Sequence, residues 1–210
     1  MTTAAVYGTG SWGTAFAAVL ADAGTSVTMW GRRSEVVDQI NGGVNADYLP
    51  DLQLPRHVRA TTDPSEASEG ADIVVLAVPS QTLRENLAAW QSLIPPSAAV
   101  VSLMKGVELG TTKRMSEVIS EVGQIEPERV VIVSGPNLAR EIAAKQPAAS
   151  TVACIREDIA DQVAHACAAP YFRPYTSTDV VGTEISGAVK NVIALAVGMA
   201  EGLGFGDNSK

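Results

Sequence analysis

The sequence predicts an α/β fold with a Rossmann-like, doubly wound, mostly parallel sheet, and two observations lead to this prediction. Short apolar or β-branched runs alternate with helical patterns along the chain, as in strands joined by crossover helices. The run at 72–78 (DIVVLAV) is continuously apolar, which is typical of a strand buried on both faces. A parallel sheet with helices on both faces accounts for both patterns.

The first half of the chain alternates strand and helix between punctuating residues. Gly24 ends the first helix, and the glycine, asparagine and proline content of 41–55 indicates a loop. Ser80 follows the end of a strand, and we expect its hydroxyl to cap the next helix. The expected elements are strands at 4–7, 26–30, 58–61 and 72–78, and helices at 12–23, at 34–40 and from 81.

The second half continues the alternation and ends in a long apolar helix from Val181. The stretch 185–203 is strongly apolar, but Lys190, Asn191 and Glu201 interrupt it, so it predicts a buried helix rather than a membrane span. Because no later segment would cover this helix, we expect either a truncated chain or a helix buried by a partner. The elements expected before it are strands at 98–103, 129–134, 149–155 and 171–175, and helices at 112–122, 138–145 and 158–168.

Composition limits the classes of function. The formal net charge of −8 argues against non-specific binding to nucleic acid or to anionic membranes, since both need a positive field. The hydrophobic fraction of 46% predicts a globular protein with a sizeable core. Cys154 and Cys167 are expected to be reduced thiols in a cytoplasmic protein. His57 and His165 lack metal-ligand spacing, so no metal site is predicted.

A glycine motif of the form GxGxxG lies at 8–13, directly after a predicted strand and at the start of a helix. Gly8 allows a tight turn, Gly10 lets the backbone approach a pyrophosphate, and Gly13 allows close helix–strand packing. The amino end of the helix supplies amide donors to an anion. This context favours a dinucleotide site, and the alternative is a plain turn.

The end of the second strand bears on the choice of dinucleotide. NAD sites usually place an acidic residue there to bind the ribose 2′-hydroxyl, but here the sequence has Arg32 and Arg33. Two guanidinium groups suit a 2′-phosphate, so NADP (NADPH) is preferred and NAD remains possible. The alternative is that both arginines are solvated loop residues.

Two lysines stand at positions where a doubly wound sheet binds ligands. Lys105 follows the strand at 98–103, at the carboxyl edge of the sheet, and its alternative is an exposed loop lysine. Lys190 lies within the apolar helix, where burial would depress its pKa and suit it to proton transfer. The alternative for Lys190 is a side chain that extends to the surface.

These motifs together resemble those of the NAD(P)H-dependent glycerol-3-phosphate dehydrogenases of bacterial type. The resemblance covers essentially the whole chain, and GAVKNVIA at 187–194 is its most specific part. The other matching segments are GxGxWG at 8–13, Lys105-Gly106, SGPN-x-A-x-E at 134–141 and the tail from 198 to 210. Family members continue into a helical domain that carries an aspartate and an arginine motif for substrate and cofactor, and this chain ends before it.

The resemblance implies a dinucleotide-binding domain at 1–177 and the start of a helical substrate domain, incomplete here, at 178–210. It implies reduction of dihydroxyacetone phosphate to glycerol 3-phosphate, which feeds glycerophospholipid synthesis, in a homodimer. Lys190 would exchange the proton with the substrate hydroxyl, and Lys105 would bind the substrate phosphate or reacting oxygen and touch the nicotinamide side. The other implied contacts are Gly135 and Asn137 for the substrate, and Ser11, Trp12, Arg32, Arg33 and Ala139 for the cofactor.

Two other classes of function remain open from the sequence. A related Rossmann dehydrogenase for a small hydroxy acid would share the glycine motif and the sheet. A dinucleotide-binding fragment or redox sensor without catalysis would also fit. Turnover of dihydroxyacetone phosphate, of hydroxy or keto acids, or of neither would separate these functions.

Overall fold

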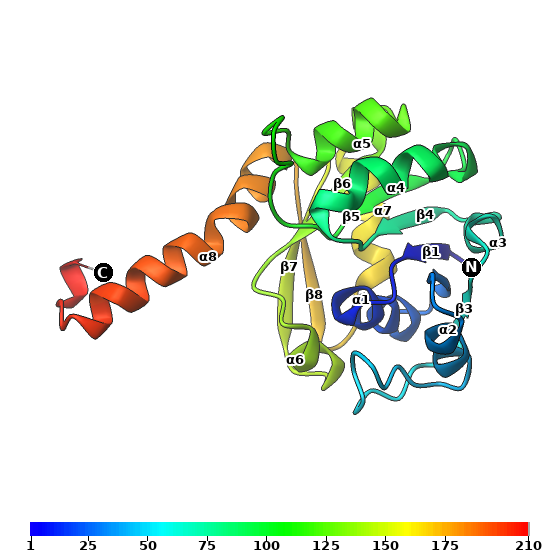
Figure 1. Ribbon diagram of the computed structural model, residues 1–210, viewed down its shortest axis with the longest axis horizontal. Coiled ribbons are helices and arrows are strands. Elements are labelled where there is room, and N and C mark those ends of the chain that lie inside the picture. The colour runs from blue at the N-terminus through cyan, green and yellow to red at the C-terminus, as the bar shows by residue number, and fades with distance from the viewer. Residues whose placement is uncertain (210) are drawn as a thin grey trace.

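The computed structural model describes residues 1–209 and confirms the predicted fold class. One sheet runs through the body of the molecule, with helices on both of its faces (Figure 1). Its eight strands lie in the order β3-β2-β1-β4-β5-β6-β7-β8. The strands are β1 (Thr3–Tyr7), β2 (Ser26–Trp30), β3 (Val58–Thr61), β4 (Ile73–Leu76), β5 (Ala99–Ser102), β6 (Val130–Ser134), β7 (Ala148–Ala153) and β8 (Phe172–Ser177).

The strands from β1 to β6 are parallel to one another, and β7 pairs with β6 in the antiparallel direction. Strand β8 is parallel to β7, so the last two strands run opposite to the first six. Glycine-rich turns and loops therefore leave β1, β4, β5 and β6 at one shared edge, which is where sheets of this type bind ligands.

Side chains of β1 alternate between two hydrophobic clusters, one on each face of the sheet. Ala4 and Val6 point into the cluster that α1 and α7 cover, while Ala5 and Tyr7 point into the cluster that α4 and α5 cover. Burial on both faces explains why the central strands are apolar without alternation. The helices are α1 (Ser11–Asp22), α2 (Ser34–Asn41), α3 (Pro64–Ser68), α4 (Leu83–Trp90), α5 (Met115–Gly123), α6 (Ala139–Ala143), α7 (Glu157–Cys167) and α8 (Val180–Gly202).

Helix starts differ from the sequence prediction at two places. Helix α5 begins at Met115 rather than at residue 112, because Thr112 has a positive φ of 58° and the carbonyl of Lys113 accepts a bond from the Glu108 amide. The expected capping role of Ser80 is wrong, since Ser80 is the first residue of a 3₁₀ turn whose cap is Pro79.

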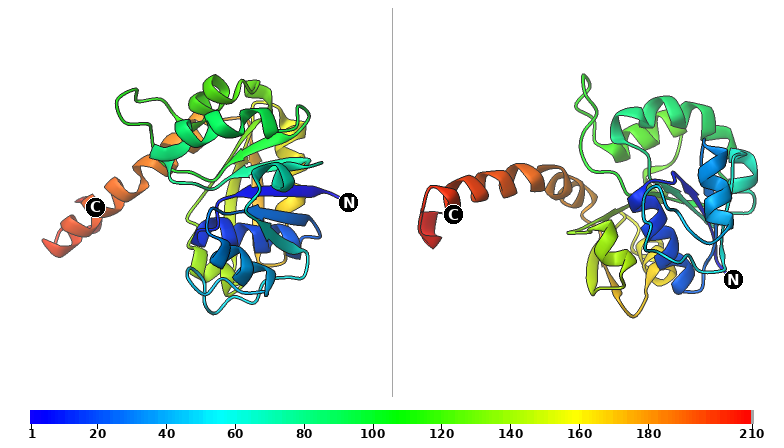
Figure 2. Two further views of the ribbon diagram at one scale, coloured as in Figure 1. Left: turned by 45° about the vertical axis from the view of Figure 1, so that its right-hand side comes forward. Right: turned by 60° about the horizontal axis from the view of Figure 1, so that its bottom comes forward.

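Helix α8 projects from the body of the molecule as a long exposed rod (Figures 1 and 2). Among its described residues only Glu184 is buried, so the described chain does not itself cover the helix that the sequence predicts to be buried. By length and composition α8 would qualify as a membrane span, with a mean hydropathy of 1.4, which is weak evidence from one helix. Lys190 is among the exposed residues of α8, so its place in an apolar run did not reveal which side of the helix packs against the rest of the chain.

Candidate active site

The glycine turn between β1 and α1 is tightly packed at two of its glycines and open at the third. Gly8 has a φ of +126°, and a Cβ there would lie 2.5 Å from the carbonyl oxygen of Ala77. A Cβ on Gly13 would lie 2.3 Å from the carbonyl oxygen of Gly8. A Cβ on Gly10 would meet no heavy atom within 4 Å, so ligand atoms have room to approach the backbone here.

A cleft of about 400 Å³ opens beside this turn. The turn supplies one wall, the ends of β2 and β4 supply others, and the segment after β5 closes it. It fits a dinucleotide because it combines an open glycine with the amino end of α1, whose first amides are free to donate to an anion. Its lining residues are Gly8, Thr9, Gly10, Trp12, Trp30, Gly31, Arg32, Tyr48, Ala77, Val78, Pro79, Leu103 and Met104.

The two arginines after β2 have different surroundings. Arg32 lines the cleft, whereas Arg33 donates to Asp47 at 2.9 Å and its guanidinium lies 5.6 Å from the ring centroid of Tyr48. Hydrogen bonds from Gln39 and Arg33 lower the pKa of Asp47. Arg32 is therefore the arginine that faces the cleft, while Arg33 contacts the loop that carries Asp47 and Tyr48.

The loop at 42–55 also holds the glycine turn through Asn45, a residue that the sequence analysis did not single out. Asn45 is fully buried, and its side-chain amide donates to the Thr9 carbonyl and to the Thr14 hydroxyl, both at 2.9 Å. The Ser11 hydroxyl makes a long contact of 3.4 Å to the carbonyl of Tyr48. No motif marks Asn45, because its partners are a backbone oxygen and a helix hydroxyl distant in sequence.

Lys105 and the turn after β6 lie together at the carboxyl edge of the parallel strands. The Lys105 ammonium donates to the carbonyl oxygen of Gly135 at 2.7 Å. The side-chain amide of Asn137 donates to the hydroxyl of Ser150, and its buried Oδ1 has no hydrogen-bond partner. A Cβ on Gly135 would lie 2.9 Å from the Ala149 carbonyl oxygen, so the turn packs closely on β7.

Lys190 of α8 lines one pocket with Gly135 and Pro136 of the same turn. Gly187 lies so close to β6 that a Cβ there would be 2.5 Å from the Ser134 hydroxyl and 3.7 Å from the stem of Lys105. Lys190 is exposed, so the expected burial is wrong and the surface alternative holds for this side chain. Partial burial lowers the pKa of Lys105, and the positive charge of Lys190 lowers it further.

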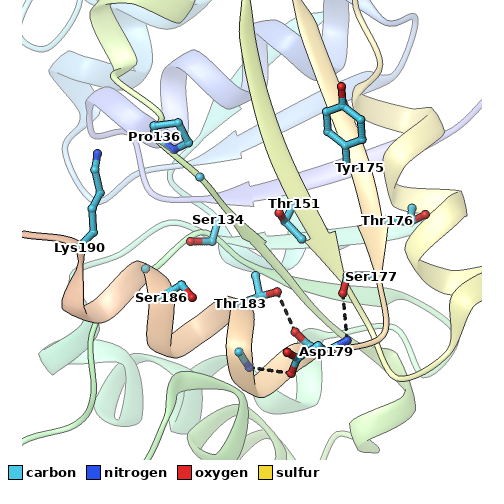
Figure 3. Close-up of a pocket in the computed structure, with 13 residues that line it drawn as sticks. Ser134, Pro136, Thr151, Tyr175, Thr176, Ser177, Asp179, Thr183, Ser186 and Lys190 are labelled. Atoms are coloured by element: carbon cyan, nitrogen blue, oxygen red, sulfur yellow. Dashed lines mark hydrogen bonds between the residues drawn. The ribbon is translucent and has the colours of Figure 1, made fainter. Parts of the chain in front are cut away.

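A polar pocket of about 640 Å³ lies between α8 and strands β6, β7 and β8 (Figure 3). Lys190 and Pro136 stand at one end of it, and Asp179, which caps α8 by accepting from the Gly182 amide, stands at the other. Neighbouring residues link this pocket to the dinucleotide cleft: Met104 lines the cleft, and Lys105 donates to Gly135, which lines the pocket.

Comparison with known proteins gives the family. Models of the NAD-dependent glycerol-3-phosphate dehydrogenase N-terminus and C-terminus match residues 3–160 and 179–210. The chain belongs to this family. It is 62% identical to a glycerol-3-phosphate dehydrogenase [NAD(P)+] of Streptomyces avermitilis over 99% of the chain and 62% of the relative, and 60% identical to one of Thermobifida fusca over 100% and 63%.

A solved dehydrogenase structure from Coxiella burnetii has the same fold. It superimposes with a TM-score of 0.85 at 34% identity, over 99% of this chain and 63% of that one. The resemblance stated from the glycine, SGPN and GAVKNVIA segments is thus confirmed. The chain spans about 62% of the length of the curated dehydrogenases that it matches.

Two further predictions concern the surroundings of this site. Ala139 is the first residue of α6 and packs against the same core cluster as Trp12 and Ala77, which line the cleft. Its contact with the cofactor stays a prediction. Across residues 1–209 no three His, Cys, Asp or Glu side chains gather as a metal site would require.

Proposed function

We propose that the protein reduces dihydroxyacetone phosphate to glycerol 3-phosphate with a nicotinamide dinucleotide and so feeds glycerophospholipid synthesis. The observation that carries this proposal is that two lysines flank the turn after β6: Lys105 donates to the carbonyl oxygen of Gly135, and Lys190 lines the polar pocket to which Gly135 belongs. A phosphorylated ketone needs cationic groups for its phosphate and its developing oxyanion, and these two ammonium groups supply them.

A nicotinamide dinucleotide held by the glycine turn and Arg32 would supply the hydride for the carbonyl carbon. Lys190 donates one proton to the carbonyl oxygen, so the ketone becomes an alcohol and the lysine becomes a neutral amine. Lys105 stabilises the negative charge that develops on that oxygen or holds the phosphate, and its bond to Gly135 fixes its direction. Gly135 and Asn137 shape the substrate side, and the lowered pKa of Lys105 reflects its partial burial beside a second cation.

The finer features belong to the same proposal. NADPH is preferred over NADH, supported by Arg32 in the cleft and by the absence of an acidic residue at the end of β2. The division into a dinucleotide-binding domain at 1–177 and a helical segment from 178 is supported by the projection of α8 from the sheet. The protein acts in the cytoplasm as a homodimer, and its two buried free cysteines agree with a reducing compartment.

One fluorescence trace tests the proposal. The chain is added to NADPH and dihydroxyacetone phosphate follows; a rise reports binding and a decay reports turnover. We expect Lys190→Ala to retain the rise and lose most of the decay, because it removes the proton donor but touches no part of the glycine turn. Turnover by Lys190→Ala equal to the parent would refute the assigned role.

The same trace separates the other functions. Decay with a hydroxy or keto acid, and none with the phosphorylated ketone, would identify a related dehydrogenase instead. A rise without decay for every substrate would identify a dinucleotide-binding module.

A further inference from the structure

Glu184 is the one buried residue of α8 in the part of the chain that the structure describes, with 8% of its surface exposed. Its carboxylate accepts from the Ser116 amide at 2.9 Å, from the Ser116 hydroxyl, and from the Arg114 guanidinium at 2.8 Å. A carboxylate with three donors is a strong attachment, because bonds to an ionised acceptor are about twice as strong as neutral ones.

The donors belong to the first turn of α5. Ser116 is the second residue of that helix and Arg114 is its cap, so the carboxylate sits at the amino end of α5, where the helix dipole favours a negative charge. Helix α8 therefore caps α5 with one of its own side chains. This attachment joins two helices that are about seventy residues apart in sequence.

The contacts of Arg114 and Glu184 also link the segments that carry Lys105 and Lys190. Val107 pairs with Arg114 across the loop between β5 and α5, and Lys105 lies two residues before Val107. Arg114 binds Glu184, and Lys190 lies six residues after Glu184 on α8. Gly187, between them, is seated on Ser134. The loop that carries Lys105 and the helix that carries Lys190 are thus fastened to each other at one point.

We infer that Glu184 is a positioning residue that fixes the rotation of α8 and so holds the Lys190 ammonium beside Lys105 at the reacting oxygen. Two contacts about one turn apart, Glu184 on α5 and Gly187 on β6, determine which side of the helix faces the pocket. Every later residue of α8 in the described part is partly or fully exposed, so the direction of Lys190 depends on this attachment. The inference rests on the proposed function for the chemistry of Lys190.

The test measures the electrostatic coupling between the two lysines and needs no turnover. The chain has five lysines, so methylation with ¹³C gives a small set of signals whose shifts follow pH. In the parent chain, Lys190→Met raises the pKa of Lys105, because a nearby positive charge is removed. In a Glu184→Gln chain, we expect Lys190→Met to leave the pKa of Lys105 unchanged, since Lys190 no longer stays close.

Glu117→Gln is the matched control. Glu117 binds the same Arg114 at 3.3 Å and its backbone amide at 2.9 Å, but it lies on α5 and holds no part of α8. We expect the coupling to persist in Glu117→Gln. Coupling that persists equally in Glu184→Gln would overturn the inference. If circular dichroism shows that Glu184→Gln does not fold, Glu184→Asp repeats the test, because it keeps the charge and shortens the reach.

Turnover is the second readout. We expect Glu184→Gln to lower kcat by about a hundredfold, as misplacement of a catalytic group by about 1 Å does, with NADPH affinity unchanged. Unchanged kcat would also overturn the inference. If Glu184→Gln loses the coupling that the parent chain shows, but the parent turns over no phosphorylated ketone, the proposed function would be refuted and the attachment of Lys190 would stand.

Discussion

The substitutions Gly13→Ala and Gly10→Ala test two separate requirements of the glycine turn, close backbone packing at Gly13 and space for a ligand at Gly10. At Gly13 the new methyl carbon would lie 2.3 Å from the carbonyl oxygen of Gly8, which belongs to the backbone and cannot rotate away. At Gly10 the new carbon would meet nothing within 4 Å, and the φ of −70° is accessible to alanine. The first change therefore strains the fold, whereas the second enters only the space left for a ligand.

The structure sets the size of both effects. Relief of the Gly13 contact requires α1 and the turn to separate by about 1 Å, and overpacking of this kind costs about 1–3 kcal/mol. Gly10 is the residue before the first helical position, where alanine costs less than about 1 kcal/mol relative to glycine. At about 2–4 °C per kcal/mol for a chain of this length, Gly13→Ala lowers Tm by about 2–12 °C and Gly10→Ala by at most about 4 °C.

Gly10→Ala, which has the smaller expected effect on Tm, is expected to have the larger effect on cofactor affinity. A methyl group there blocks close approach of a phosphate to the backbone, and loss of one hydrogen bond to a charged group costs about 1.5–3 kcal/mol. The Kd for NADPH would rise by about tenfold to a hundredfold. Fluorescence titration and thermal unfolding of the same preparations check both numbers. A Gly10→Ala chain that binds NADPH like the parent would refute the proposed position of the pyrophosphate.

Three further outcomes follow from the contacts described. Arg32→Ala is expected to weaken NADPH binding more than NADH binding, and Arg33→Ala to weaken both alike through the Tyr48 loop; the opposite pattern in paired titrations would exchange their roles. Hydrogen bonds from Arg84 and Thr111 lower the pKa of Glu108 in the folded chain to about 2. The ionised carboxylate therefore adds to the free energy of unfolding above its pKa in the unfolded chain, about 4.3, and this contribution is lost as the pH falls toward 2. Midpoints of urea unfolding should therefore fall less steeply between pH 5 and 2 in Glu108→Gln than in the parent. Burial raises the pKa of Cys167 to about 12, so a thiol reagent should modify it only after urea unfolds the chain, and modification of the native chain at the same rate would contradict its burial.

The sheet and the glycine turn were predictable because their signals are local. A continuous apolar run and a GxGxxG motif between a strand and a helix depend on neighbours in sequence, and the structure places them as expected. The short helix α3 was missed, since five residues give too little periodicity. The start of α5 was misplaced because the left-handed backbone at Thr112 stops the helix from extending backwards.

The parts of the site that sequence reasoning missed depend on contacts between distant segments. Asn45 holds the glycine turn and Asp47 pairs with Arg33, yet both look like ordinary loop residues. Glu184 resembles any charge on a helix, and only the fold reveals that it caps α5. The apolar composition of α8 predicted burial, but composition does not say which surface provides the cover, and the described chain leaves most of the helix exposed.

The reversed direction of β7 and β8 determines where α8, which carries Lys190, starts relative to the sheet. Because these strands run opposite to the first six, β8 ends at Ser177, which is level with Ala153 of β7 and so with Ile132 in the middle of β6. Lys190 lies ten residues after the start of α8, a rise of about 15 Å along the helix axis. Gly187, seven residues after the start of α8, already lies against Ser134 at the carboxyl end of β6, so an insertion or deletion between β8 and Gly187 would change which residue of α8 lies beside Lys105.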